Sequence, residues 1–278
     1  MINQDRLSVY KDETAKYTKR DAVHALLFAA YVYLLFIGFW ITVNVFDVSR
    51  TVGQLFGVLV TLVVLLPLSF IVIKKGQGLH SLGLSLINWA KAIGAGLFFV
   101  VAFLMFNRGL LPGLLGGWQF QPTRTIAWLV VYGLIMAFWE DVVHIGYIQT
   151  RIYGLIKKDK LAILVGSLMF AAFHYPLIFA ANIVNNRSFG SDFWIDLLTL
   201  TFTWATLHIA MNAVFRRFYS IIPVTLLHFS INFSHGNLWV DGGGNGLNRF
   251  VFLGITVLLV LTVTVFLPFS DKKRNVIN

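Results

Sequence analysis

Cysteine is absent from this chain of 278 residues, which excludes disulfides, thiolate metal sites and a cysteine nucleophile. Charged residues are also scarce, because Asp, Glu, Lys and Arg make up only 12% of the chain. A soluble domain averages about 25%. Hydrophobic residues make up 58%, and the mean hydropathy is +0.76. This composition predicts an integral membrane protein whose surface lies largely against the lipid bilayer.

The N-terminal segment lacks the features of a cleaved signal peptide. Residues 1–24 form a polar tail without a short apolar run followed by a small-residue cleavage site. The formal net charge is +10, but the basic residues fall at the ends of apolar segments rather than in one patch. We therefore expect no nucleic-acid partner.

Long apolar segments account for most of the chain. A transmembrane helix needs roughly 20 apolar residues, and eight segments approach or exceed this length if the short third and seventh borrow flanking residues. The segments are Ala25–Val45, Leu55–Ile73, Ile93–Phe106, Ile126–Tyr147, Leu161–Ile183, Phe193–Val214, Ile221–Phe233 and Phe250–Phe269. We predict an all-α polytopic fold of about eight transmembrane helices. Residues 1–278 would form one membrane-embedded domain, with its catalytic core at about 126–236.

The distribution of Lys and Arg supports this count. With the N-terminus in the cytoplasm, all but five of the 22 basic residues fall in cytoplasmic segments. The five on the outer side are Arg50, Arg108, Arg124, Arg187 and Arg249. Because cytoplasmic loops carry an excess of Lys and Arg, this alternation predicts eight spans with both termini cytoplasmic.

The stretch AFWEDVVHIGYIQTR, Ala137–Arg151, places ionisable groups inside the fourth apolar segment. Glu140 and Asp141 are adjacent, and His144 follows one α-helical turn after Glu140. Ionisable residues at membrane depth are costly and usually mark functional sites. Adjacent residues diverge by about 100° around a helix, so we expect Glu140 to face a cavity and Asp141 to support it.

Three later spans carry polar residues at similar depth. These residues are His174 in the fifth span, His208 and Asn212 in the sixth, and His228 and Asn232 in the seventh. At 1.5 Å per residue, Glu140 lies roughly 21 Å below the outer end of its span, and His174 roughly 20 Å above the inner end of its own. We therefore expect Glu140, His174 and His228 to meet in one cavity, whereas His208 and Asn212 are expected to be structural.

This set of groups suits hydrolysis without a covalent intermediate. A carboxylate can act as general base toward water, and histidine and asparagine N–H groups can stabilise an oxyanion. Two alternatives use the same residues. Two histidines and a carboxylate can also bind zinc, which we do not favour, so no cofactor is expected. A proton-coupled carrier can use acids and histidines as a relay, although the sequence shows no repeat symmetry typical of transporters.

The order of an acidic pair, FxxxH and HxxxN on three separate spans of an eight-span protein resembles the CPBP (CAAX protease and bacteriocin-processing, or Abi) family of intramembrane proteases. The motifs are Glu140–Asp141, FAAFH ending at His174, and RRFYSIIPVTLLHFSINF with His228 and Asn232. The resemblance implies that Glu140 activates water and that His174 is a second catalytic group. It also implies that His228 and Asn232 orient water and stabilise the oxyanion.

One position departs from the family pattern. The family reads EExxxR, whereas this chain has Asp141 as the second acid and Ile145 in place of the arginine. His144 lies beside that position and is a candidate supporting residue. Because of this departure, the alternative remains that the protein is a non-catalytic family member that acts as an immunity or scaffold protein.

We therefore predict an intramembrane glutamic-type endopeptidase in the cell membrane, of bacterial plasma-membrane type. Its partners would be the lipid bilayer and a membrane-associated peptide or protein. By resemblance, that substrate would be a bacteriocin, a pheromone or a CAAX protein.

Overall fold

The computed structural model describes residues 6–46, 48–84, 89–105, 119–120, 126–184, 189–236, 239–240 and 245–266. These residues are almost entirely helical, which confirms the predicted all-α fold. The longer helices are α1 (Arg6–Ala15), α2 (Lys19–Val45), α3 (Arg50–Lys74), α4 (Trp89–Met105), α6 (Ile126–Asp141), α8 (Asp159–Phe173), α9 (Tyr175–Val184), α10 (Ser191–Phe218), α11 (Ile221–Gly236) and α12 (Asn245–Phe266). The short 3₁₀ helix η1 is Leu79–Leu82, the π-helix η3 is Val142–Gln149 and α7 is Thr150–Ile152. The two-residue strands β1 (Gln119–Phe120) and β2 (Trp239–Val240) pair antiparallel.

Within the described ranges, five helices are long and apolar enough to cross a membrane, so the chain is a multi-pass helical membrane protein. They are Lys19–Val43, Val52–Lys74, Val130–Ile152, Asp159–Ala180 and Ser191–Phe218. Three shorter apolar helices, Ala90–Phe103, Ile221–Asn232 and Gly254–Val265, coincide with the third, seventh and eighth predicted spans. The total of eight spans and the cytoplasmic placement of both ends remain predictions.

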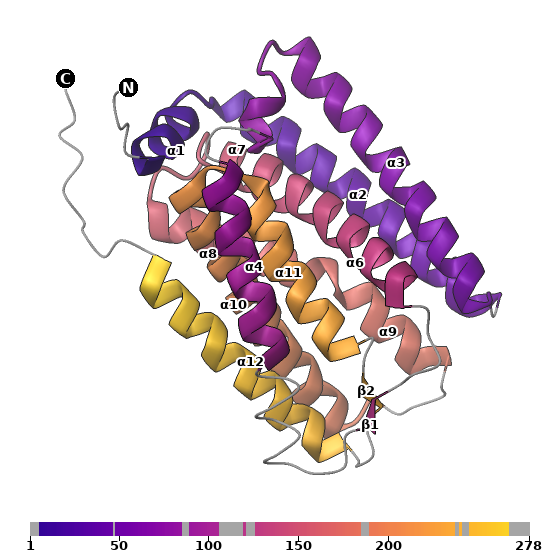
Figure 1. Ribbon diagram of the computed structural model, residues 1–278. Helices are drawn as coiled ribbons and strands as arrows, with labels where there is room; N and C mark the ends of the chain where they lie inside the picture. The colour runs from indigo at the N-terminus through magenta and orange to yellow at the C-terminus, as the bar shows by residue number, and fades with distance from the viewer. Residues whose placement is uncertain are drawn as a thin grey trace.

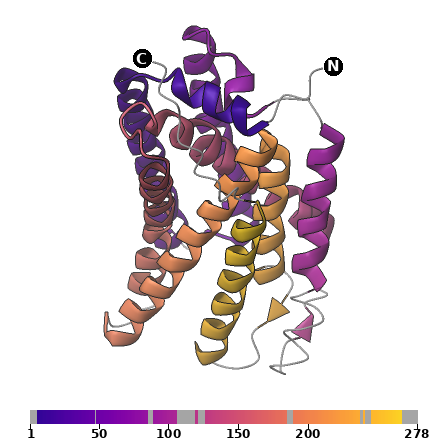
Figure 2. The ribbon, with the colours of Figure 1, turned by 90° about the vertical axis from the view of Figure 1, so that its left-hand side faces the viewer.

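The long helices form a bundle in which α2 and α3 lie on one side and α12 on the other (Figure 1). Between them, α11 packs against α4, α6 and α10, while α10 also packs against α8 and α12. The helix α1 lies across one end of the bundle (Figure 2). The motif-bearing helices α6, α8, α10 and α11 thus occupy the interior, where side chains from four helices can meet.

Large apolar side chains cover the outer faces of the bundle. Leu34 on α2 is 69% exposed, Leu66 on α3 is 68% and Leu198 on α10 is 70%. Exposure of this extent along whole helices marks a face that lies against lipid. By contrast, every residue from Trp139 to Tyr153 is buried. The stretch with the acidic pair is therefore enclosed by protein rather than lipid.

The polar N-terminal tail contributes a docked helix. Tyr10 of α1 is 1% exposed and packs edge-on against the rings of Tyr153 and Phe215, each with centroids 6.0 Å away. A capping box then begins α2, because the Thr18 hydroxyl accepts from the Asp21 N–H and the Asp21 carboxylate accepts from the Thr18 N–H.

Candidate active site

A π-helix follows the acidic pair directly. The α-helix α6 ends at Asp141, and the eight residues of η3 continue it with a wider turn. π-Helical turns are rare and often occur at functional sites. The Gly146 carbonyl of this segment accepts hydrogen bonds from the side chains of Thr150 at 2.7 Å and Arg151 at 2.9 Å. The α-helical spacing that placed His144 beneath Glu140 therefore does not hold beyond Asp141.

Two histidines from other helices face Glu140. The Nε2 atom of His228 on α11 lies 3.8 Å from Glu140 Oε2, and the Nε2 atom of His174 lies 4.0 Å from the same oxygen. These separations are too long for direct hydrogen bonds and leave a gap that a bridging water can fill. The side chains of Glu140 and His174 retain 11% and 12% of their exposure. The structure thus brings together the three residues that the depth argument predicted would meet.

Asp141 holds His228 from the side opposite Glu140. Its Oδ1 lies 2.9 Å from His228 Nδ1, and the two side chains are 0% and 2% exposed. A carboxylate oxygen accepts, so Nδ1 carries the hydrogen and Nε2 is left facing Glu140. Asp141 therefore contacts the imidazole rather than the gap, and its supporting role remains a prediction.

His174 lies at a break in the fifth span, which the sequence had predicted as one continuous helix. Its backbone N–H bonds to the Ala171 carbonyl, three residues back, and α9 begins at Tyr175. Pro176 explains the break, because a proline lacks an N–H and fits only the first turn of a helix. The ring is fixed by a 2.9 Å bond from Nδ1 to the Phe170 carbonyl and by stacking on Trp204 at 4.4 Å. Since that carbonyl accepts from Nδ1, Nε2 is the ring's free acceptor when the ring is neutral.

Phe170 lies at the centre of four imidazole rings and is fully buried. The rings of His174, His208, His144 and His228 have centroids 4.8, 5.1, 5.2 and 5.9 Å from its own. His144 is 2% exposed and also packs against Phe173 at 4.8 Å. The four imidazole rings are thus arranged around the buried ring of Phe170.

His208 and Asn212 form a separate buried polar group on α10. Asn212 Nδ2 lies 3.0 Å from both the His208 Nδ1 atom and the His208 backbone oxygen. The Ser167 hydroxyl of α8 lies 3.1 Å from the same Nδ1. These bonds join α8 to α10, which is consistent with the predicted structural role.

The remaining residues of the family pattern have contrasting surroundings. Asn232 lies one turn beyond His228 on α11, and its side chain is exposed. Ile145 is fully buried within η3 and packs in the main hydrophobic core. The part of Asn232 in binding an oxyanion remains a prediction.

Arg151 is a buried residue that was not among the candidates from the sequence. It is 1% exposed, and its Nη2 donates to Gln77 Oε1 at 2.8 Å and to Ser81 Oγ at 2.7 Å. Its Nη1 donates to the carbonyls of Ser81 and Gly146 and to the Thr150 hydroxyl. The guanidinium thus ties η1 to the end of η3. Arg151 lies six residues after Ile145, at the end of an apolar segment. Its burial could not be predicted from this position.

A metal site is not apparent in the described part of the chain. Across these ranges, no group of three or more His, Cys, Asp or Glu side chains is arranged to hold a metal ion. Zinc therefore remains an alternative that has to be tested chemically.

A family model matches the part of the chain that contains the site. Residues 122–234 match the family model described as type II CAAX prenyl endopeptidase Rce1-like. The matched range contains Glu140, Asp141, His174, His228 and Asn232. A comparison with curated proteins finds no match. The motifs, their convergence and this match agree, and residues 122–234 are therefore similar to the Rce1-like proteases of the CPBP family.

Proposed function

We propose that this protein is an intramembrane endopeptidase in which Glu140 activates water against a peptide bond. The observation that carries the proposal is the convergence of two imidazole Nε2 atoms on Glu140 Oε2, at 3.8 and 4.0 Å. Water held among these three atoms would be deprotonated by the carboxylate as its oxygen attacks the carbonyl carbon.

The proposed roles follow from the surroundings of each group. His228, fixed by Asp141, and Asn232 would orient the water and stabilise the oxyanion of the tetrahedral intermediate. When the C–N bond breaks, the proton taken up by Glu140 returns to the leaving amine, with His174 as the second proton-transfer group. Water supplies the remaining oxygen and hydrogen atoms, so no cofactor is required by this scheme.

The proposed substrate is a membrane-associated peptide or protein, and the family description points to a prenylated CAAX sequence. A bacteriocin or pheromone precursor is the alternative substrate carried over from the sequence resemblance. Partial exposure of the Glu140 and His174 side chains is compatible with entry of a peptide bond from the membrane. The proposed location is a bacterial plasma membrane.

The experiment is cleavage of a prenylated CAAX peptide and of a secretion-leader peptide by the purified full chain in lipid nanodiscs, followed by mass spectrometry. Glu140→Gln preserves size and should abolish cleavage, whereas Asp12→Asn, on an exposed position of α1, should leave cleavage unchanged. Persistent cleavage by Glu140→Gln would disprove the proposed base. Exhaustive chelation is expected to leave activity intact, and its loss would favour the zinc alternative.

A proton relay is the second candidate function, because four histidines surround Phe170 next to Glu140. This function predicts pH-driven uptake into liposomes that Glu140→Gln abolishes. Absence of such flux, together with peptide cleavage, would exclude the relay in favour of the protease.

A further inference from the structure

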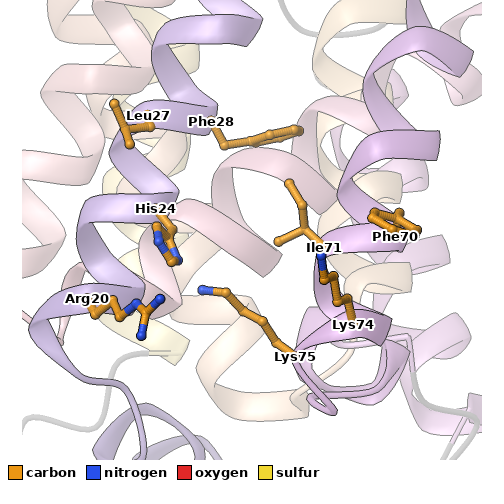
Figure 3. A pocket seen from close by; sticks show the side chains of 8 residues that line it. All are labelled: Arg20, His24, Leu27, Phe28, Phe70, Ile71, Lys74 and Lys75. Atoms are coloured by element: carbon orange, nitrogen blue, oxygen red, sulfur yellow. The ribbon is translucent and has the colours of Figure 1, made fainter.

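A cavity of about 650 Å³ lies between α2 and α3, away from the proposed active site (Figure 3). Four basic side chains line it, namely Arg20, His24, Lys74 and Lys75. Four apolar side chains complete its wall, namely Leu27, Phe28, Phe70 and Ile71. Its size is typical of a small-molecule site.

The basic and apolar residues are separated by depth. On α2, Arg20 lies in the first turn, and Leu27 lies two turns further in. On α3, which runs in the opposite direction, Phe70 precedes Lys74 at the end of the helix. Both walls therefore change from charged to apolar in the same direction. This polarity matches a phospholipid, which has a charged headgroup and apolar chains.

The charged side chains at the cavity carry more positive than negative charge. Lys75 pairs with Asp21 at 3.1 Å and extends between the two helices (Figure 3). Arg20 and Lys74 are exposed, and the Lys74 ammonium lies 5.8 Å from the Phe70 ring. One carboxylate among three cations leaves a net charge that attracts an anionic headgroup rather than a zwitterionic one.

We propose that this cavity binds an anionic phospholipid of the adjacent leaflet. The phosphate contacts Arg20, Lys74 and Lys75, and an acyl chain runs along Leu27 and Phe70. The distribution of Lys and Arg along the chain predicts that the end of α2 and α3 with these basic residues faces the cytoplasm, where basic residues meet anionic lipid.

The bound lipid also supports the packing of α2 against the interior. Phe28 forms the buried wall of the cavity, and its ring packs edge-on against Tyr147 of η3 with centroids 5.5 Å apart. The Tyr147 ring in turn lies 4.6 Å from the Arg151 guanidinium. A lipid that holds α2 and α3 together therefore stabilises the contacts around η3.

The test measures the thermal unfolding of the full chain in detergent with added phosphatidylglycerol or phosphatidylcholine of the same acyl chains. Phosphatidylglycerol should raise the melting temperature more. The double variant Arg20→Gln, Lys74→Gln keeps the Lys75–Asp21 pair and should weaken phosphatidylglycerol binding about tenfold or more. The matched control, Lys158→Gln with Lys160→Gln, removes two charges that do not line the cavity and should retain the effect.

Two further measurements distinguish a lipid site from general charge attraction. Leu27→Trp adds bulk to the apolar wall without changing any charge and should reduce the amount of phosphatidylglycerol retained in native mass spectrometry. Inorganic phosphate and glycerol phosphate should not reproduce the stabilisation. Equal stabilisation by both lipids, equal loss in the control variant, or full stabilisation by inorganic phosphate would each overturn the proposal.

Discussion

The Nδ1 atom of His228 lies 2.9 Å from Asp141 Oδ1, and both side chains are buried. Because of this contact, the two adjacent carboxylates face different nitrogen atoms of His228. Asp141 binds the back of the imidazole, while Glu140 faces its Nε2 atom at 3.8 Å. One histidine thus connects both carboxylates, and the resulting arrangement can be tested by substitution at either end.

Asp141→Asn keeps an oxygen that can accept from His228 Nδ1 but removes the charge. We expect kcat to fall about 100-fold with a smaller change in KM, because the amide no longer enforces a hydrogen on Nδ1 and no longer stabilises the charged form of the imidazole. Steady-state kinetics on the cleaved peptide measure this. Asp192→Asn, on an exposed position of α10, is the control. An equal fall in stability and activity would indicate a merely structural role.

Trp204→Ala removes the ring that stacks on His174 with centroids 4.4 Å apart. Aromatic stacking contributes about 0.5–1.5 kcal/mol, so we expect roughly a tenfold fall in kcat as the imidazole turns away from Glu140. Trp204→Phe should restore most of the activity. Trp194→Ala on the same helix, at an exposed position, should leave kcat unchanged.

Gly146→Ala should destabilise the protein. A Cβ atom at this position would lie 2.6 Å from the Leu82 carbonyl oxygen, so η1 and η3 would have to separate. Overpacking of this kind costs about 1–3 kcal/mol. The melting temperature in detergent measures the effect. Gly94→Ala on α4 is the control, because no atom lies within 4 Å of a Cβ there and alanine favours a helix.

Arg151→Lys tests the buried guanidinium. An ammonium has three N–H donors on one nitrogen, fewer than the five oxygen acceptors that the two guanidinium nitrogens reach, and carbonyls left without a donor cost about 1–3 kcal/mol each. We expect a lower melting temperature, with η3 exchanging its amide hydrogens faster. Arg217→Lys, at an exposed position on α10, should show neither change.

Glu13 predicts a pH dependence for the docking of α1. Burial raises the pKa of Glu13, but hydrogen bonds from Lys16 and Tyr17 more than offset this, so the pKa lies below its usual value. A carboxylate with a lowered pKa stabilises the folded state above its unfolded pKa, and this contribution is lost as the pH falls through the folded pKa. Acidification through this lowered pKa should therefore release α1, as measured by hydrogen exchange. Glu13→Gln should remove this dependence, and an unchanged acid transition in that variant would contradict the assignment.

The helical membrane fold follows from the sequence alone, because the length and apolar character of each span are local properties of the chain. The sequence also indicates which residues are candidates for the site, since acids and histidines at membrane depth require partners. Their spacing predicted that Glu140, His174 and His228 share a depth. The order of the motifs resembles that of the CPBP family, and the family match at residues 122–234 supports this resemblance.

The way in which these residues are held depends on tertiary contacts. The π-helical turn after Asp141, the stacking of His174 on Trp204 and the burial of Arg151 all depend on contacts between segments far apart in the sequence. Hydropathy and α-helical spacing carry no information about which carbonyl a buried side chain will reach. Buried polar groups must nevertheless find partners, so the packing of α6, α8, α10 and α11 selected Asp141 for His228 and left Glu140 facing the gap.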